Sequence, residues 1–183
     1  MNSNFFRSPL VNNSKDSHHE NSIRFIDTCF FYDNPNLPVT SIDLKKYAGT
    51  WYSLYSIPTV FDKGSRETIT KYTMNKSGYY DVVTTYKKPS DETVHSITSK
   101  IFPNENRSMA KMKCQFIWPI KVDYWVIELA DDYSYVVVGH PDHKFLFIMS
   151  RTPKMNKKTY EDILGRCRDK GYDVDKLTSQ FHN

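Results

Sequence analysis

Cysteine is scarce in this chain of 183 residues, which has only Cys29, Cys114 and Cys167, spaced far apart. No C-x-x-C pair occurs, and this argues against a zinc site built on cysteine pairs. Three thiols can form at most one disulfide, so one thiol stays free. The sequence therefore indicates a protein that does not depend on disulfide bonds, or one from a reducing compartment.

Long hydrophobic runs are also missing. No stretch of 18 apolar residues occurs, so the sequence predicts no transmembrane helix. The opening MNSNFFRSPLVNNSKDSHHENS lacks the charged start and apolar core of a signal peptide. Cys29 follows Asp27 and Thr28, not the small residues expected before a lipid-attachment cysteine. We therefore expect a soluble protein, and its cellular location stays open.

Blocks of one charge and enzyme signatures are missing as well. The net charge is +4 without a Lys/Arg block of five, so no nucleic-acid partner is indicated. His140 and His143 flank Asp142 in GHPDHK, but turn histidines on a surface are far commoner than metal ligands. No G-x-S-x-G, phosphate loop or paired-carboxylate signature stands out. We therefore predict no metal, no cofactor and no catalytic residue.

Aromatic residues, in contrast, make up 15% of the chain, and they favour β-strands. Residues 1–37 are polar, without a sustained period, and we expect a disordered tail followed by one domain over 38–183. Turn signals then separate alternating segments that predict strands over 50–57, 66–74, 79–88, 93–102, 108–118, 122–130, 133–140 and 143–151. Eight short strands predict an antiparallel meander that closes as a barrel or folds as a sandwich.

The last part of the chain has a helical pattern. Apolar residues recur at intervals of three and four from Met155 to Cys167 and predict a helix over 157–170 that packs outside the sheet. Asn156 is the expected N-cap and Gly171 the expected stop, while Asp43 is expected to cap a short turn before the first strand. The segment YDVDKL, residues 172–177, is predicted to add a short edge strand.

Alternation along the strands predicts which side chains face inward. In three strands, one set of alternate residues is uncharged, and we assign that set to the interior. In a fourth strand, Glu128 is assigned to the outside, so the alternate set is assigned to the interior. The residues predicted to face inward are Thr68, Thr70, Tyr72, Met74, Tyr80, Val82, Thr84, Tyr86, Ala110, Met112, Cys114, Phe116, Trp125, Ile127 and Leu129. Both phases of 143–151 are apolar, so we expect that strand to be covered on both faces. An interior of Tyr, Met and hydroxyl groups favours a wall around a small ligand, but a plainly packed core fits the pattern equally well.

Three motifs resemble the signatures of the lipocalin family: LKKYAGTWYSLYSIP, ADDYSYVVVGHP and FLFIMSRTP, in that order. The likeness covers roughly residues 38–178. DYWVIELADDYSY, SRTP and GYDVDKL point to the group of bacterial lipocalins, plant temperature-induced lipocalins and apolipoprotein D. The resemblance implies an eight-stranded antiparallel up-and-down barrel with one C-terminal helix packed outside.

The resemblance also implies roles for residues. Gly49, Trp51 and Arg151 are expected to close the base of the barrel, with Arg151 across the Trp51 ring. The expected cargo is a small hydrophobic ligand, such as a fatty acid or lysophospholipid, and Lys63 or Lys88 at the rim is a candidate for its head group. The implied wall consists of Tyr72, Val82, Thr84, Tyr86, Met112, Cys114, Trp125, Ile127, Phe145 and Phe147, with Phe61 at the mouth.

Two other functions remain open at this point. One is a lipocalin-fold enzyme that acts on lipids, either an isomerase or a peroxide reductase that uses Cys114, although a thiol buried in an apolar wall is normally inert. The other is an interaction module with a vestigial cavity. The resemblance implies that the chain carries or stores its ligand and has a role in membrane stress. We expect a monomer or weak homodimer. Peripheral membrane contact is compatible with the resemblance.

Overall fold

Eight strands of the chain close into an antiparallel up-and-down barrel, seen in a computed structural model that describes residues 36–60, 62–104 and 108–182. The strands are β1 (Gly49–Ile57), β2 (Arg66–Met74), β3 (Tyr80–Lys88), β4 (Asp91–Asn104), β5 (Ser108–Ile117), β6 (Ile120–Leu129), β7 (Tyr135–Gly139) and β8 (Leu146–Ser150). Each pairs with the next, and β1 pairs with both β2 and β8, which closes the ring. The prediction of an eight-stranded barrel is confirmed.

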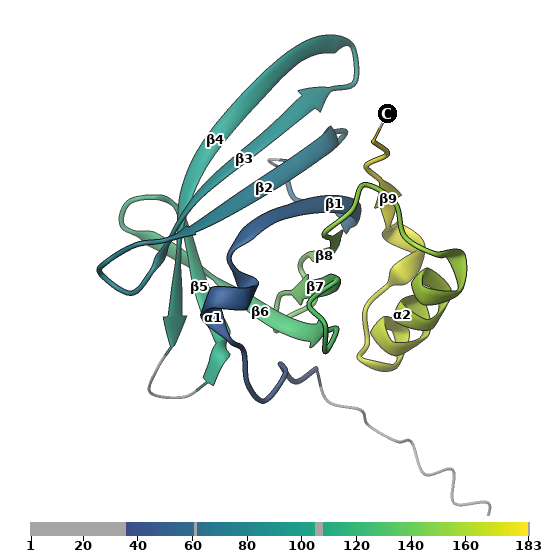
Figure 1. The fold of residues 1–183 in the computed structure, drawn as a ribbon. Coiled ribbons are helices and arrows are strands. Elements are labelled where there is room, and N and C mark those ends of the chain that lie inside the picture. Colours follow the sequence, from purple (N-terminus) through teal and green to yellow (C-terminus); the bar gives the residue numbers. More distant parts are fainter. Residues whose placement is uncertain (1–35, 61, 105–107, 183) are drawn as a thin grey trace, which may run out of the picture. The chain divides into compact units, whose positions relative to one another are not determined.

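Short elements frame the barrel at both ends of the chain. Helix α1 (Leu44–Tyr47) precedes β1, and the Asp43 carboxylate caps it by accepting hydrogen bonds from the Lys45 and Lys46 amides. Helix α2 (Lys157–Asp169) lies outside the barrel next to β7 and β8 (Figure 1). The Asn156 side chain caps α2 by accepting from the Lys158 amide at 2.8 Å. The predicted outer helix is confirmed.

The predicted tail lies almost entirely outside the described residues, and Phe61 lies outside them too.

Strand β8 is covered on both faces because its two phases belong to different clusters. Phe145, Phe147 and Met149 point into the barrel, where they pack with Trp51, Met112 and the other side chains of its interior. We call this group of interior side chains the inner cluster. Leu146 and Ile148 face outward and pack against α2. This outer cluster also includes Val137, Ile163 and Cys167. A strand enclosed between a barrel core and a helix needs apolar residues in both phases, as its sequence indicated.

The expected edge strand at 172–177 is wrong. Residues Val174–Lys176 form a short 3-10 turn, η1, and the strand that follows, β9 (Thr178–Ser179), pairs with β1. Gly171 ends α2 with φ +88°, and the Tyr172 amide donates back to the Cys167 carbonyl. Tyr172 and Val174 pack into the outer cluster. Their spacing of two residues therefore reflects a turn that packs on the helix and not a paired strand.

The prediction that Trp125 and Ile127 face inward is also wrong. Both side chains belong to the outer cluster, whereas Tyr124 and Val126 lie in the inner cluster. A register shift between Val126 and Glu128 in the pairing of β6 with β7 marks a β-bulge. The bulge inserts one residue, so strict alternation counted back from Glu128 assigns the wrong face to every earlier residue of β6. Leu129 lies beyond the bulge and packs against the inner cluster as expected.

Candidate functional site

The base of the barrel is closed by Trp51 and Arg151. Trp51 at the start of β1 is fully buried, and its indole nitrogen donates to the Tyr47 carbonyl at 2.9 Å. The Arg151 guanidinium lies 3.6 Å from the centre of the Trp51 ring. It also donates to the carbonyls of Thr50, Lys46, Tyr47 and Ala48. Arg151 thus ties the end of the last barrel strand to the segment that leads into the first.

A layer of tyrosines lies next to this base. The Tyr124 hydroxyl shares hydrogen bonds with the hydroxyls of Tyr72, at 2.8 Å, and Tyr47, at 3.1 Å. The Tyr80 hydroxyl donates to the Leu44 carbonyl at 2.6 Å. Burial raises the pKa of each of these four phenols, so they stay neutral at physiological pH. The closed half of the barrel is therefore solid and held together by neutral hydrogen bonds.

The barrel interior changes from filled to open along its axis. On β5, Met112 is fully buried and Cys114 is 4% exposed, and a register shift after Cys114 ends the regular alternation before Phe116. On β4, the inner-face residue Ser99 is 9% exposed, but Ile97, which lies nearer the open end, is 37% exposed. On β6, Tyr124 is buried, while Val122 in the same phase is exposed. Inner-phase side chains that are exposed must face open space and not a packed core. The interior beyond Cys114 is therefore accessible from the end of the barrel opposite Trp51.

The structure brings together six of the predicted wall residues in or against the inner cluster: Tyr72, Val82, Met112, Cys114, Phe145 and Phe147. Thr84 and Tyr86 share the phase of Val82 on β3 and are half-buried nearer the open end. Trp125 and Ile127 are not part of this wall, as described above.

Strand β4 adds wall residues that alternation did not identify. Its register with β3 pairs Val82 with Ser99, Thr84 with Ile97, and Tyr86 with His95, so these β4 side chains share the inner face. The sequence TVHSITSKIF mixes polar and apolar residues in both phases, which explains why no phase was assigned. The pairing register was the missing signal.

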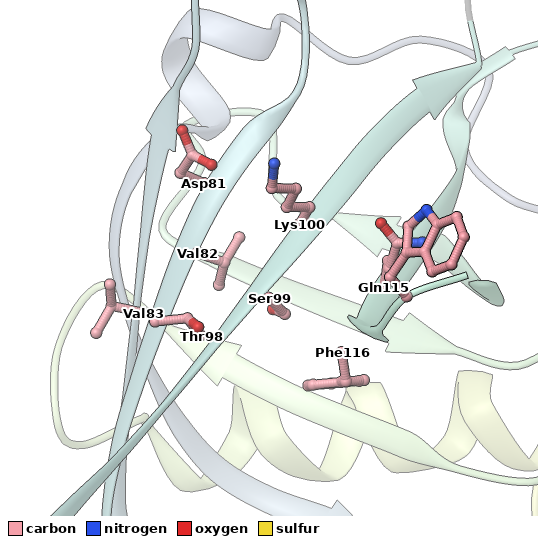
Figure 2. A pocket seen from close by; sticks show the side chains of 9 residues that line it. Asp81, Val82, Val83, Thr98, Ser99, Lys100, Gln115 and Phe116 are labelled. Atoms are coloured by element: carbon pink, nitrogen blue, oxygen red, sulfur yellow. The ribbon is translucent and has the colours of Figure 1, made fainter. Parts of the chain in front are cut away.

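The surface has two hollows. One, of about 340 Å³, lies on the outer face of β3, β4 and β5, where Asp81, Lys100 and Gln115 pair side by side, and not in the barrel interior. It is lined by Asp81, Val82, Val83, Thr98, Ser99, Lys100, Gln115, Phe116 and Trp118 (Figure 2). The other, of about 670 Å³, lies at the rim and is lined by Pro58, Lys63, Gly64, Ser65, Arg66, Pro89, Glu92, Thr178, Ser179 and Phe181. Arg66 and Lys87 form ion pairs with Glu67 and Glu92 beside this rim hollow.

The wall of the barrel contains one thiol, that of Cys114, among the described residues. Burial raises the pKa of the Cys114 thiol to about 12, although a hydrogen bond with Ser99 lowers it in part. The thiol is therefore protonated at neutral pH and is a weak nucleophile. Among residues 36–60, 62–104 and 108–182, no group of three or more His, Cys, Asp or Glu side chains is arranged to hold a metal.

No helix in these ranges is long and apolar enough to cross a bilayer.

Comparison with known proteins gives a family match over most of the chain. The model of the Lipocalin-like domain matches residues 42–182. Temperature-induced lipocalin-1 of Arabidopsis thaliana is 30% identical over 148 residues, which cover 76% of this chain and 78% of the relative. Apolipoprotein D of Bos taurus is 30% identical and covers 79% of each chain. Outer membrane lipoprotein Blc of Escherichia coli K12 is 28% identical and covers 76% of this chain and 78% of the relative.

Solved structures agree on the fold. Lobster apocrustacyanin A1 superposes with a TM-score of 0.64 at 13% identity and covers 77% of this chain and 80% of that one. Insecticyanin from the tobacco hornworm Manduca sexta gives a TM-score of 0.62 at 18% identity and covers 80% and 84%. The family match supports binding of a small hydrophobic ligand as the general function.

Proposed function

Because this chain belongs to the lipocalin-like family, we propose that it binds a single-chain lipid, such as a fatty acid or a lysophospholipid, and carries or stores it. The lipid lies in the open half of the barrel. The observation that carries this proposal is the loss of burial along the inner phases of two strands, from Ser99 to Ile97 on β4 and from Tyr124 to Val122 on β6. Apolar side chains that face an accessible interior gain free energy when a lipid chain covers them.

The expected affinity follows from the buried chain. Each methylene removed from water contributes about 0.8 kcal/mol, so ten methylenes contribute about 8 kcal/mol before the costs of association. The solid tyrosine layer sets the depth to which the chain can enter. Chain length is therefore expected to affect affinity up to that depth and little beyond it.

The head group of the lipid lies at the rim. Lys63 and Arg66 line the rim hollow, and Lys63 is exposed. Their positive charges suit a carboxylate or phosphate, whereas Glu92 on the opposite side of the hollow pairs with Arg66 and Lys87. Lys63 is thus the more available cation for an anionic head group.

The lipid is exchanged at a membrane surface. The tip of the β5–β6 hairpin, which lies at the open end, exposes Ile117, Trp118 and Ile120, and Trp118 is 83% exposed. Lys121 follows them in the chain, and its ammonium group lies 3.8 Å from the centre of the Phe102 ring. An apolar tip next to a cation suits insertion between anionic lipid head groups.

The test combines identification of the lipid with a pair of wall variants. Native mass spectrometry and lipid extraction of the purified protein are expected to reveal a bound single-chain lipid. Ile97→Glu places a charge on the inner face of β4 and is expected to reduce palmitate affinity at least tenfold. Val94→Glu, on the outer face of the same strand, is the matched control and leaves affinity unchanged. Absence of bound lipid, together with equal affinity of both variants, contradicts the proposal.

A further inference from the structure

The C-terminal segment completes the wall of the barrel between β1 and β2. These two strands pair only from Gly49 to Tyr52, and farther toward the open end they separate. Strand β9 takes up the free edge of β1 there, with Ser179 opposite Tyr55 and Thr178 opposite Ser56 (Figure 1). On the other side, the Phe181 carbonyl accepts a hydrogen bond from the Glu67 amide of β2. Residues 178–182 therefore bridge the gap.

This segment brings a polar side chain into the wall. Gln180 is only 2% exposed, and its amide nitrogen donates to the Ser56 hydroxyl at 2.9 Å. Ser56 pairs with Phe147 of β8, which packs against the inner cluster, so Ser56 and Gln180 lie on the inner face. The Gln180 side-chain oxygen has no hydrogen-bond partner among the described residues.

Two further buried oxygens without a partner in the described chain lie in the same wall. They are the hydroxyls of Ser53 and Thr68, which are 3% and 8% exposed. The β1–β2 pairing ends at Tyr52 and Ile69, and Ser53 and Thr68 are the next residues of the two strands beyond that point. Ser53 also pairs with Met149, an inner residue of β8, and Thr68 shares the phase of Tyr72. Both hydroxyls therefore face the interior where β1 and β2 part.

Three such oxygens in one wall call for a partner. An unsatisfied buried polar group costs about 1–3 kcal/mol, and native proteins leave few of them. The Gln180 oxygen can only accept a hydrogen bond, so the partner must donate one. Beyond the tyrosine layer, the described residues that lie beside these oxygens on the inner face of β1, β2 and residues 178–180 are uncharged: Ser53, Ser56, Thr68, Thr178 and Gln180. A carboxylate or phosphate could accept from the Ser53 and Thr68 hydroxyls, but it would leave the Gln180 oxygen without a donor and would have no counter-charge beside it.

We propose that Ser53, Thr68 and Gln180 form a polar subsite inside the barrel that binds a neutral hydroxyl group of the lipid. This inference rests on the proposed lipid-binding function. It means that the carrier selects among lipids by an uncharged hydroxyl inside the barrel. A lysophospholipid has such a hydroxyl in addition to the anionic head group at the rim, and a monoacylglycerol has one without an anionic group. The C-terminal segment, through Gln180, is then a determinant of specificity as well as part of the wall.

The test compares ligands that differ in their polar group. Affinities of the full chain for 1-monopalmitoylglycerol, methyl palmitate and palmitate are measured by displacement of a fluorescent lipid probe. The wild-type protein is expected to bind monopalmitoylglycerol about tenfold more tightly than methyl palmitate, which has no hydrogen-bond donor. Thr68→Val keeps the shape of the side chain and removes the hydroxyl, and it is expected to reduce this ratio at least threefold. Gln180→Leu is expected to do the same.

Matched controls separate this effect from folding. Thr73→Val makes the same substitution on the exposed outer face of β2 and leaves the ratio unchanged. Thermal unfolding is measured for each variant, and if Gln180→Leu does not fold, Thr68→Val alone decides. Equal affinity of the wild-type protein for both esters, or an unchanged ratio in Thr68→Val, overturns the subsite and means that the oxygens hold only water. Failure to bind any of the three lipids overturns the proposed function as well.

Discussion

Arg151 crosses the ring of Trp51, with its guanidinium carbon 3.6 Å from the ring centre. Because Arg151 directly follows β8 and Trp51 lies near the start of β1, this contact holds the two strand ends together. A cation over a buried indole contributes about 2 kcal/mol when both groups are desolvated. The guanidinium also donates to four carbonyls of the segment from Lys46 to Thr50. The two residues close the base of the barrel and leave the opposite end for the ligand.

This contact depends on Gly49. The φ angle of Gly49 is +101°, and a Cβ atom there would lie 3.3 Å from a terminal nitrogen of Arg151. We expect Gly49→Ala to lower the free energy of unfolding by about 1–3 kcal/mol, since it combines backbone strain with displacement of the guanidinium. Urea denaturation measures the change.

The matched control is Gly165→Ala in α2, where a Cβ atom would meet nothing within 4 Å. Replacing a helix-interior glycine by alanine is expected to raise stability by up to about 1 kcal/mol. Opposite signs for the two substitutions are expected. Equal stability of Gly49→Ala and the wild-type protein would show that the base tolerates a side chain at this position.

The buried thiol of Cys114 predicts a pH dependence of stability. Its pKa is raised to about 12 in the folded protein because burial disfavours the thiolate. An acid with a raised folded pKa contributes stability that is complete below its unfolded pKa and is lost as pH rises toward the folded value. For Cys114 this interval starts near pH 9, the ordinary thiol value.

Cys114→Ser is therefore expected to have a shallower loss of stability between pH 9 and 10.5 than the wild-type protein. The difference is at most about 1.4 kcal/mol per pH unit. The tyrosines are common to both proteins, so the difference isolates the thiol. Retained lipid binding and no peroxide turnover in either protein are expected, whereas turnover that disappears in Cys114→Ser would establish the peroxide reductase alternative.

The exposed tip of the β5–β6 hairpin predicts contact with membranes. The double variant Trp118→Ser, Ile120→Ser is expected to reduce co-sedimentation with anionic phosphatidylserine vesicles at least fivefold, because it removes the apolar surface that inserts between head groups. Leu37→Ser removes an exposed apolar side chain elsewhere and is the control. Equal co-sedimentation of all three proteins would rule out this tip as the membrane contact.

Much of the fold could be predicted from local patterns. Strand and turn signals predicted eight strands, and periodic apolar residues predicted α2, because both depend on neighbours within one element. The inner face of β5 followed from alternating Lys and apolar residues, since no other phase keeps Lys111 and Lys113 in water. The double apolar pattern of β8 likewise indicated a strand enclosed between the barrel and the helix.

In the other strands, which side chains face the interior depended on how the strands pair in the folded structure. The bulge between Val126 and Glu128 turned Trp125 and Ile127 outward, and nothing in the local alternation marks the extra residue. Ser99 joined the wall through its register with Val82, which depends on two strands at once. The sequence by itself determined which segments are strands and helix, and its resemblance to the lipocalins implied that Arg151 meets Trp51. Only the three-dimensional structure brought Gln180 beside Ser56, because residues 124 apart become neighbours only when the barrel closes.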